Sequence, residues 1–377
     1  MQSSLMSSPL RVTCFAGTRP ECLKLASLSM EAQSDHRFDL NLVSSGQHPL
    51  MVSETFAHLG LPVHASLPPV PPGSPISKCI SHLRHHAKQW LEANRPDIVL
   101  VQGDTSTAYA CALAAFDCGL PLAHLEAGLR TSNPMRPFPE EPFRRRIAKL
   151  TRWHLAPTSD AAAHLRREGF TDDSIHMVGN SIADLLRLTL ENPVSHQIPW
   201  RSHGSRLLVM TLHRRENYQK GLANVCSALL QLLELEPELC VVCPTHPNPL
   251  VSSRLQQLLG GHPRILVIPA LAYGRFIPLL KEACLVVTDS GGIQEEAAYI
   301  GVPVLVARSE TERPEAARFG AVQLTGTNPA LLLQACQAWL GSVRPVPCAF
   351  DADAPFGDGN TAARVLSTLW ASRHSIL

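Results

Sequence analysis

Short apolar runs alternate along the chain with longer segments of helical periodicity. The apolar runs are continuous, which is typical of parallel strands covered on both faces, so the pattern predicts repeated strand–helix units. In the first half of the chain the expected strands are Arg11–Ala16, Leu40–Val43, Ile98–Val101, Leu122–Leu125 and Trp153–Ala156. In the second half they are Arg206–Thr211, Leu239–Pro244, Ile265–Ile268, Leu285–Thr288 and Val304–Val306.

The two halves of the chain begin alike, each with a strand that ends in a cationic turn. A chain of 377 residues also exceeds the size at which one hydrophobic core usually stops growing. We therefore expect an α/β protein with two Rossmann-like, doubly wound parallel-sheet domains that face a cleft. Their expected bounds are residues 1–190 and 191–358, with a polar linker between Glu191 and Ser205.

Charge and composition restrict the partners that such a protein can have. The 33 basic and 32 acidic side chains form no long run of one sign, which argues against a nucleic-acid surface or an anionic-membrane patch. No apolar stretch has the length of a membrane span, and the N-terminus lacks the pattern of a signal peptide. We expect a cytoplasmic protein whose partner is a small molecule.

Some histidine and cysteine spacings resemble those of metal sites. Cys240 and Cys243 have the spacing of a redox or zinc pair, but they lie within an expected buried strand, which favours core packing. His82, His85 and His86 have i, i+3, i+4 spacing, which is more often an exposed helix face than a chelating one. We therefore expect no bound metal and interpret the 11 cysteines as reduced thiols.

A candidate phosphate site follows the expected strand Leu285–Thr288. Ser290-Gly291-Gly292 leads there into a helix, whose free N–H groups and positive dipole end favour a diphosphate, while glycine allows a close approach. Glu296 lies one turn further and can accept hydrogen bonds from ribose hydroxyls. Paired glycines before a helix are also common in proteins without a phosphate ligand, and Glu296 can simply cap the helix.

Cationic side chains occur at both strand ends that open the domains. Arg19 and Lys24 are expected near one helix N-terminus, where positive charge is misplaced unless an anion binds. His213 and Arg214 occupy the equivalent place in the second domain and can neutralise the charge on a departing nucleotide. The alternative interpretation is a solvated surface charge in each case.

Carboxylates follow neighbouring strands of the first domain. These are Asp104, Glu126 and the pair Glu140 and Glu141. A site with carboxylates on one wall and cations on the other suits general base chemistry on a sugar that is bound through phosphate. A lone carboxylate is usually a solvated charge, but several at consecutive strand ends favour a functional interpretation.

Taken together, these motifs resemble the non-hydrolysing UDP-N-acetylglucosamine 2-epimerases over nearly the full length of the chain. In the first domain the matching motifs are Gly17-Thr18-Arg19-Pro20-Glu21, Gly46-Gln47-His48, Gly103-Asp104-Thr105, His124-Leu125-Glu126-Ala127-Gly128-Leu129-Arg130-Thr131 and Pro139-Glu140-Glu141. In the second they are Gly179-Asn180-Ser181, His213-Arg214-Arg215-Glu216-Asn217, His246-Pro247-Asn248-Pro249, Thr288-Asp289-Ser290-Gly291-Gly292-Ile293-Gln294-Glu295-Glu296 and Thr311-Glu312-Arg313-Pro314-Glu315.

The resemblance implies the two-domain fold of nucleotide-sugar glycosyltransferases (GT-B type), a homodimer, no redox cofactor and interconversion of UDP-GlcNAc with UDP-ManNAc through a 2-acetamidoglucal. It also implies a C-terminal helix, within residues 359–377, that crosses back to the first domain. The acid/base and catalytic residues it implies are Asp104, Glu126, Glu140 and His213. The residues implied to bind the UDP-sugar are Arg19, Lys24, Arg130, Arg214, Phe276, Ser290, Gly291, Gly292, Glu296 and Arg313.

The chain departs from the family pattern at several positions. Phe143 stands where the family has an asparagine, and Leu212 replaces a small residue before His213. A proline-rich segment replaces one that in several members helps hold an activating second UDP-GlcNAc. The positions implied for that activator are Gln47, His48, Glu141 and His246. The alternative functions are 2-epimerisation of a related UDP-sugar such as a 2,3-diacetamido uronic acid, hydrolytic release of ManNAc, and glycosyl transfer.

Overall fold

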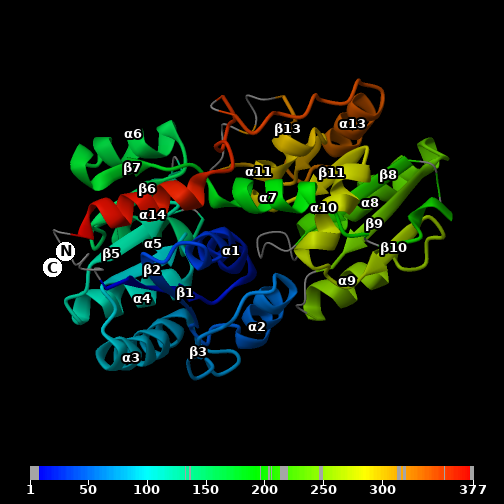
Figure 1. Cartoon of the computed structure of the whole chain (residues 1–377). Coiled ribbons are helices and arrows are strands. Elements are labelled where there is room, and N and C mark those ends of the chain that lie inside the picture. Colours follow the sequence, from blue (N-terminus) through cyan, green and yellow to red (C-terminus); the bar gives the residue numbers. More distant parts are fainter. Residues whose placement is uncertain are drawn as a thin grey trace. The chain divides into compact units, whose positions relative to one another are not determined.

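The computed structural model describes residues 8–131, 133–135, 137–195, 197–202, 204, 206–212, 220–245, 249–311, 316, 320–351 and 353–373. The chain divides into two compact units. The first unit combines Met1–Leu185 with Asp351–Leu377, and the second is Leu186–Phe350. Each unit contains one parallel sheet with helices packed against it (Figure 1).

The first unit is built on a 7-stranded sheet in the order β3-β2-β1-β4-β5-β6-β7. Its strands are β1 Leu10–Ala16, β2 Phe38–Ser44, β3 Ala65–Ser66, β4 Ile98–Gln102, β5 Leu122–Leu125, β6 Trp153–Ala156 and β7 Ile175–Met177. Its helices are α1 Arg19–Gln33, α2 Pro49–His58, α3 Ile76–Asn94, α4 Ser106–Asp117, α5 Glu140–Ala148, α6 Ser159–Arg167 and α14 Thr361–Ala371. The chain builds outward from β1 through β2 and then returns to add β4 on the other side, so the switch point lies between β1 and β4.

The second unit is built on a 6-stranded sheet in the order β10-β9-β8-β11-β12-β13. Its strands are β8 Arg206–Thr211, β9 Leu239–Pro244, β10 Ile265–Ile268, β11 Leu285–Thr288, β12 Val304–Val306 and β13 Val322–Leu324. The helices are α8 Lys220–Leu235, α9 Pro249–Leu259, α10 Tyr273–Glu282, α11 Gly291–Ile300 and α13 Pro329–Leu340, and α7 Ser181–Glu191 spans the division between the units. Here the switch point lies between β8 and β11.

All strand pairs in both sheets are parallel, and the prediction of two doubly wound parallel sheets is confirmed. The sequence pattern missed β3, β7 and β13, and each of them lies at the edge of its sheet. Edge strands are short and one side lacks a neighbour, so they do not need a continuous apolar run. Polar positions inside β7 and β13, at His176 and Gln323, show this directly.

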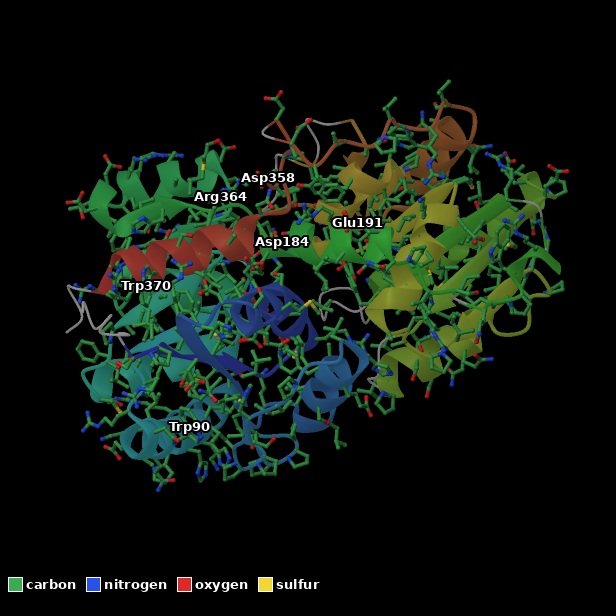
Figure 2. The ribbon with its side chains drawn as sticks, viewed as in Figure 1. Trp90, Asp184, Glu191, Asp358, Arg364 and Trp370 are labelled. Atoms are coloured by element: carbon green, nitrogen blue, oxygen red, sulfur yellow. The ribbon has the colours of Figure 1, made fainter. Side chains whose placement is uncertain are left out.

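The C-terminal helix α14 packs within the first unit, beside α1 (Figure 1). Its N-terminal end is fixed to the start of α7, because the Ala362 N–H donates to Asp184 Oδ1 at 2.8 Å. The Arg364 guanidinium donates to the Val178 carbonyl at 3.0 Å and pairs with Asp358. Further along, the Trp370 ring lies edge-on to Phe38, with ring centroids 5.9 Å apart. Figure 2 labels Arg364 and Trp370 on this helix, and Asp184 and Asp358 near its N-terminal end.

Gly128, which follows β5, has to be a glycine for two separate reasons. Its φ is +87°, and a Cβ there would lie 2.3 Å from the carbonyl oxygen of Ala161. Gly169 has a similar φ of +91°, but a Cβ added to Gly169 would meet no atom within 4 Å. We expect Gly128→Ala to lower the free energy of unfolding by about 2 kcal/mol more than Gly169→Ala, because only the former adds a backbone clash to the strain. Urea denaturation of both variants measures this difference, and equal losses would contradict it.

Candidate functional site

The strand ends after β4 and β5 bring Asp104 and Glu126 into neighbouring loops. Gln102 pairs in register with Leu125, and the Gly103 N–H donates to the Leu125 carbonyl at 3.0 Å. His124 supports the same loop, since its Nε2 lies 2.7 Å from the Gly103 carbonyl. Burial lowers the pKa of His124 to about 3, so the imidazole is neutral and donates its proton to that carbonyl.

Glu126 is the most constrained of the candidate carboxylates. Its φ is +68°, a left-handed conformation that costs energy in any residue but glycine. One carboxylate oxygen lies 2.5 Å from Lys24 Nζ, and the other accepts a hydrogen bond from the Gln102 amide. The side chains of Lys24 and Glu126 are only 7% and 8% exposed. A strained backbone that presents a buried, paired carboxylate favours a functional role over a solvated charge.

Asp104 is oriented by an arginine that the sequence did not single out. The Arg144 guanidinium on α5 contacts Asp104 Oδ2 through Nε at 2.7 Å and Nη2 at 2.5 Å. The Asp104 side chain is 24% exposed, whereas that of Arg144 is 5% exposed. Glu140 begins the same helix and is half-buried. The carboxylates predicted after neighbouring strands are therefore held by α5 and by the loops after β4 and β5.

The N-terminus of α1 contains a carboxylate that the electrostatic argument from the sequence did not consider. Glu21 lies there fully buried and accepts hydrogen bonds from the Gly17 N–H at 3.0 Å and the Thr18 hydroxyl at 2.8 Å. The protein thus supplies its own carboxylate at this helix end, where Thr18 and Glu21 have the spacing of a capping box. Arg19 is the first residue of α1, and burial lowers the pKa of its guanidinium, an effect that Glu54 opposes. That Arg19 and Lys24 bind an anion stays a prediction.

Glu21 also ties two loops together across the switch point of the sheet. Its other oxygen accepts from the Thr105 hydroxyl at 2.6 Å, although the two residues are 84 positions apart. Thr105 in turn caps α4 by accepting from the Ala108 N–H at 3.0 Å. Glu21 therefore connects the N-terminal end of α1, where Arg19 lies, to the loop that carries Asp104. The spacing Thr18-x-x-Glu21 is the signal that could have identified it.

We expect the stability of the protein to depend on pH through Glu21. Burial raises the pKa of this carboxyl from 4.5 to about 7, because the charged form is poorly solvated. The stability that the protonated form contributes is present below pH 4.5 and is lost as the pH rises through 7. Glu21→Gln is expected to remove that loss, which amounts to about 3 kcal/mol. Unfolding by urea at several pH values, in both proteins, measures the difference.

The matched control for this measurement is Glu31→Gln, an exposed glutamate on the same helix. Glu31→Gln should leave the pH dependence of the free energy of unfolding as it is in the unsubstituted protein. A Glu21→Gln curve that stays parallel to that of the unsubstituted protein between pH 4.5 and 7 would contradict the assignment.

In the second unit the predicted phosphate turn lies at the switch point between β8 and β11. Ser290 is the N-cap residue of α11, which begins at Gly291. The turn is held by hydroxyls: the Ser290 N–H donates to Thr288 Oγ1 at 3.0 Å, and Thr288 Oγ1 lies 2.7 Å from Thr211 Oγ1 on β8. The N–H groups of the first turn of α11 are therefore presented at the point where open α/β sheets bind ligands.

Neither the backbone conformation nor the packing of the protein requires a glycine at position 292. A Cβ at this position would meet its nearest neighbour, Ser290 Oγ, only at 3.9 Å, and the φ lies outside the left-handed region. Alanine in the first turn of a helix would be more stable than glycine. A glycine that neither backbone strain nor packing requires is what a closely approaching ligand would need.

Glu296 and Phe276 lie on the elements that flank this turn. Glu296 is 5% exposed on α11, and Phe276 is half-buried on α10. Tyr273, at the start of α10, lies near Glu296: burial and the carboxylates of Glu296 and Glu295 together raise the pKa of its hydroxyl well above the ordinary value. The Tyr273 hydroxyl therefore stays protonated next to the carboxylate predicted to bind ribose.

The remaining predicted residues have defined places in the first unit. Arg130 forms a two-point ion pair with Glu168, at 2.8 and 2.7 Å, and Glu141 is completely buried. Gln47 Oε1 accepts hydrogen bonds from the N–H and the hydroxyl of Thr107, at 3.0 and 2.8 Å, and His48 is the N-cap residue of α2. His213, Arg214, His246 and Arg313 lie outside the described residues.

The cysteine pair that has the spacing of a metal site lies inside a strand of the second sheet. Cys240 and Cys243 are buried on β9, at 1% and 0% exposure. In the part of the chain that the structure describes, no group of three or more His, Cys, Asp or Glu side chains is arranged to hold a metal ion. Over the same residues, no helix combines the length and the apolar character needed to span a membrane.

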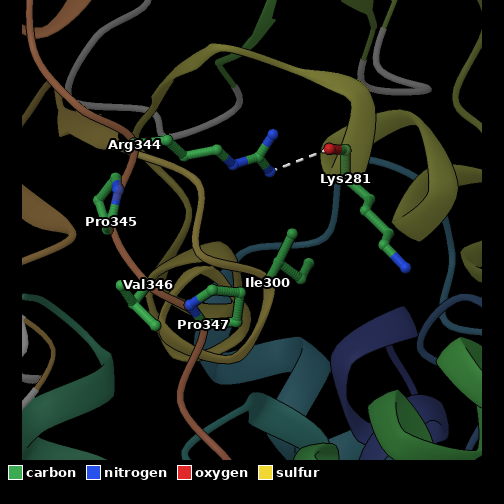
Figure 3. A pocket seen from close by; sticks show the side chains of 6 residues that line it. All are labelled: Lys281, Ile300, Arg344, Pro345, Val346 and Pro347. Atoms are coloured by element: carbon green, nitrogen blue, oxygen red, sulfur yellow. Dashed lines mark hydrogen bonds between the residues drawn. The ribbon is translucent and has the colours of Figure 1, made fainter.

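A hollow of about 400 Å³ in the second unit contains none of the predicted site residues. Its lining consists of Lys281, Ile300, Arg344, Pro345, Val346 and Pro347 (Figure 3). The Arg344 guanidinium donates there to the Lys281 carbonyl at 2.9 Å and to the Gly301 carbonyl at 2.7 Å. These carbonyls lie at the C-terminal ends of α10 and α11, so Arg344 satisfies helix ends that would otherwise need other partners.

Comparison with known proteins decides the family. A family model described as UDP-N-acetylglucosamine 2-epimerase matches residues 30–370. The chain belongs to this family. A UDP-N-acetylglucosamine 2-epimerase of Salmonella typhimurium is 34% identical over 376 residues, which cover 97% of this chain and 100% of the relative.

Solved structures of the UDP-N-acetylglucosamine 2-epimerase family have the same fold. The enzyme of Neisseria meningitidis bound to UDP-GlcNAc superposes with a TM-score of 0.87 at 31% identity, covering 96% of this chain and 100% of that one. The Methanocaldococcus jannaschii enzyme in complex with UDP-GlcNAc and UDP gives a TM-score of 0.84 at 30% identity, covering 96% and 99%.

The residues at which the chain departs from the family pattern pack in the cores of the units. Phe143 is 3% exposed and stacks on Tyr109, with ring centroids 4.8 Å apart. Leu212 is 2% exposed and belongs to the core cluster of the second unit. We therefore assign both side chains to packing.

Proposed function

We propose that the protein interconverts UDP-GlcNAc and UDP-ManNAc. A base removes the C2 proton, the C2–H electron pair forms the C1–C2 double bond, and the C1–O bond breaks with its electrons on the departing UDP. Return of a proton to the opposite face of C2 and re-addition of UDP at C1 complete the inversion. The overall change is redox-neutral, so the reaction requires no redox cofactor.

The observation that carries this proposal is the pair of neighbouring strand ends with Asp104 and Glu126. Inversion at C2 needs an acid/base group for each face of the ring, and these carboxylates, with Glu140 on α5, are the candidates. Lys24 Nζ lies 2.5 Å from the Glu126 carboxylate and holds it in place. A glycosyltransferase of the same fold has no need for several carboxylates at consecutive strand ends.

The second unit supplies the residues proposed to bind the UDP leaving group. The first turn of α11, with Ser290, Gly291 and Gly292, suits a diphosphate, and Glu296 suits the ribose hydroxyls. Stabilising the diphosphate is essential, because the C2 proton is not next to a carbonyl and leaves only if the C1–O bond breaks. The UDP-GlcNAc bound by the Neisseria and Methanocaldococcus relatives supports this substrate.

Other roles rest on the family resemblance and belong to the proposal. His213 would stabilise the departing UDP, and Arg19, Arg130, Arg214, Phe276 and Arg313 would bind the UDP-sugar. We further propose that the enzyme is non-hydrolysing, that it forms a homodimer and that it works in the cytoplasm.

A product assay tests the proposal and separates the alternatives. The protein is incubated with UDP-GlcNAc, and proton and phosphorus NMR follow the sugar and the diphosphate. UDP-ManNAc in equilibrium with UDP-GlcNAc is the expected result. Accumulation of free ManNAc with UDP would support the hydrolysing alternative. An unchanged spectrum would exclude this substrate and direct the assay to UDP-2,3-diacetamido uronic acids.

A further inference from the structure

Asp104 is the first member of a continuous series of ion pairs in the first unit. Arg144 contacts Asp104 at 2.5 Å and Glu141 at 3.1 Å. Glu141 continues to Arg145 at 2.9 Å, and Arg145 to Glu168 at 2.8 Å. Glu168 ends the series with the two-point pair to Arg130 described above. We call this series the Asp104–Arg130 charge chain.

Burial makes the centre of the charge chain rigid. Glu141 is 0% exposed and Arg144 is 4% exposed, so neither can exchange its partner for water. Opposite charges alternate along the chain, and the Arg144 guanidinium donates to Asp104 on one side and to Glu141 on the other. Glu141 thus holds the Arg144 guanidinium through Nη1, while Nε of the same guanidinium donates to Asp104.

Asp104 needs such support because of where it lies. It follows Gly103, whose φ is +71°, in a loop rather than in a regular element. A carboxylate that transfers a proton has to be held within a fraction of an ångström, and loops alone do not achieve this. Arg144 fixes one oxygen of that carboxylate at two points, from a helix.

We propose that Arg144 is a positioning residue for Asp104, and that Glu141 acts on the site by holding Arg144. The proposal rests on the proposed function, in which Asp104 is an acid/base group. It gives Glu141 a role inside the protein: its carboxylate is fully buried and occupied by Arg144 and Arg145, so it orients these cations rather than presenting itself to a second nucleotide.

The test is a double-mutant cycle with Arg144→Gln and Asp104→Asn, assayed with UDP-GlcNAc. Arg144→Gln alone is expected to lower kcat about 10- to 100-fold with little change in KM, because it displaces a reacting group without removing a substrate contact. In the Asp104→Asn background the same substitution should have almost no further effect. Independent, multiplying losses in the two backgrounds would overturn the proposal.

Two further variants separate positioning from general stability. Arg146→Gln makes the same change at an exposed position of the same helix and should leave kcat and KM unchanged. Arg144→Lys keeps the charge but offers only a point contact, so it should fold and recover part of kcat. If Arg144→Gln does not fold, the cycle is run with Arg144→Lys, and a full kcat in that variant would overturn the proposal.

The cycle also distinguishes this proposal from the proposed function. If the unsubstituted protein does not act on UDP-GlcNAc, the proposed function fails. The urea midpoints of the same variants then test the positioning claim without substrate. Losses from Arg144→Gln and Asp104→Asn that overlap in the double variant support it, and fully additive losses overturn it.

Discussion

Glu126→Gln is expected to lower the rate of epimerisation about a thousandfold, because a positioned acid/base group contributes 10²- to 10⁴-fold to catalysis. The amide cannot take up a proton from C2, yet it can still accept the hydrogen bond from Gln102. UDP should bind with unchanged affinity, since its proposed contacts lie mainly on the second unit. Turnover with UDP-GlcNAc and calorimetric titration with UDP measure the two effects separately.

The Glu126→Gln variant needs a control for stability. It removes the carboxylate that lies 2.5 Å from the buried Lys24 Nζ, which should cost about 3 kcal/mol. The double variant Lys24→Met with Glu126→Gln removes both charges and should regain much of that loss while remaining inactive. Retained turnover in Glu126→Gln, or recovery of turnover in the double variant, would contradict the assigned role of Glu126.

Gly292→Val is expected to weaken UDP binding about 100-fold while leaving the unliganded protein folded. Overpacking a tight contact costs about 1 to 3 kcal/mol, and each 1.4 kcal/mol is a tenfold change in affinity. The space that the new side chain would enter contains no protein atom closer than Ser290 Oγ, at 3.9 Å from a Cβ. Calorimetric titration with UDP and urea denaturation together test this prediction.

The same position provides a graded series. Gly292→Ala should weaken UDP binding less than Gly292→Val and should stabilise the unliganded protein by about 0.5 to 1 kcal/mol, because alanine is the better helix residue. Gly261→Ala, at an exposed glycine of the same unit with open space around it, should leave UDP binding unchanged. Unchanged UDP binding in Gly292→Val would show that no ligand approaches this turn closely.

The sequence was sufficient for the interior strands of both sheets and for the edge strand β10 (Ile265–Ile268), but not for the edge strands β3, β7 and β13. A strand such as β11, covered on both faces, is apolar over most of its length, and Leu285–Thr288 was predicted with its observed bounds. β13 pairs only with β12 and has Gln323 in its middle, so the continuous apolar signal is absent. An edge strand of this kind forms because its backbone pairs with that of the neighbouring strand. The hydrophobic pattern of the segment itself does not record this pairing.

In the candidate site, too, some residues could be predicted from the sequence and others could not. The places of Asp104, Glu126 and Ser290 could be predicted, because each lies within two residues of the end of a recognisable strand and the parallel strands of a sheet end at one edge. The residues that hold these side chains in place could not be predicted. Gln102 and Glu126 are 24 positions apart, and Arg144 and Asp104 are 40 positions apart, so their contacts follow from the order of the strands rather than from any local spacing.

The electrostatic interpretation of Arg19 and Lys24 shows a further limit of local reasoning. The sequence argument counted the cations near the N-terminus of α1 and inferred a missing anion. Glu21 was present in the same motif, and Glu126 comes from a distant part of the chain to pair with Lys24. Net charge at a helix end has to be judged after tertiary partners are known.

Deuterium incorporation at C2 is the measurement that tests the central claim most directly. The protein is incubated with UDP-GlcNAc in deuterated water, and NMR follows the C2 position of both epimers. Elimination and re-addition predict that UDP-ManNAc forms with deuterium at C2 and that recovered UDP-GlcNAc gains deuterium as well. UDP-ManNAc that keeps the original hydrogen at C2, or UDP-GlcNAc that neither exchanges nor epimerises, would contradict the account.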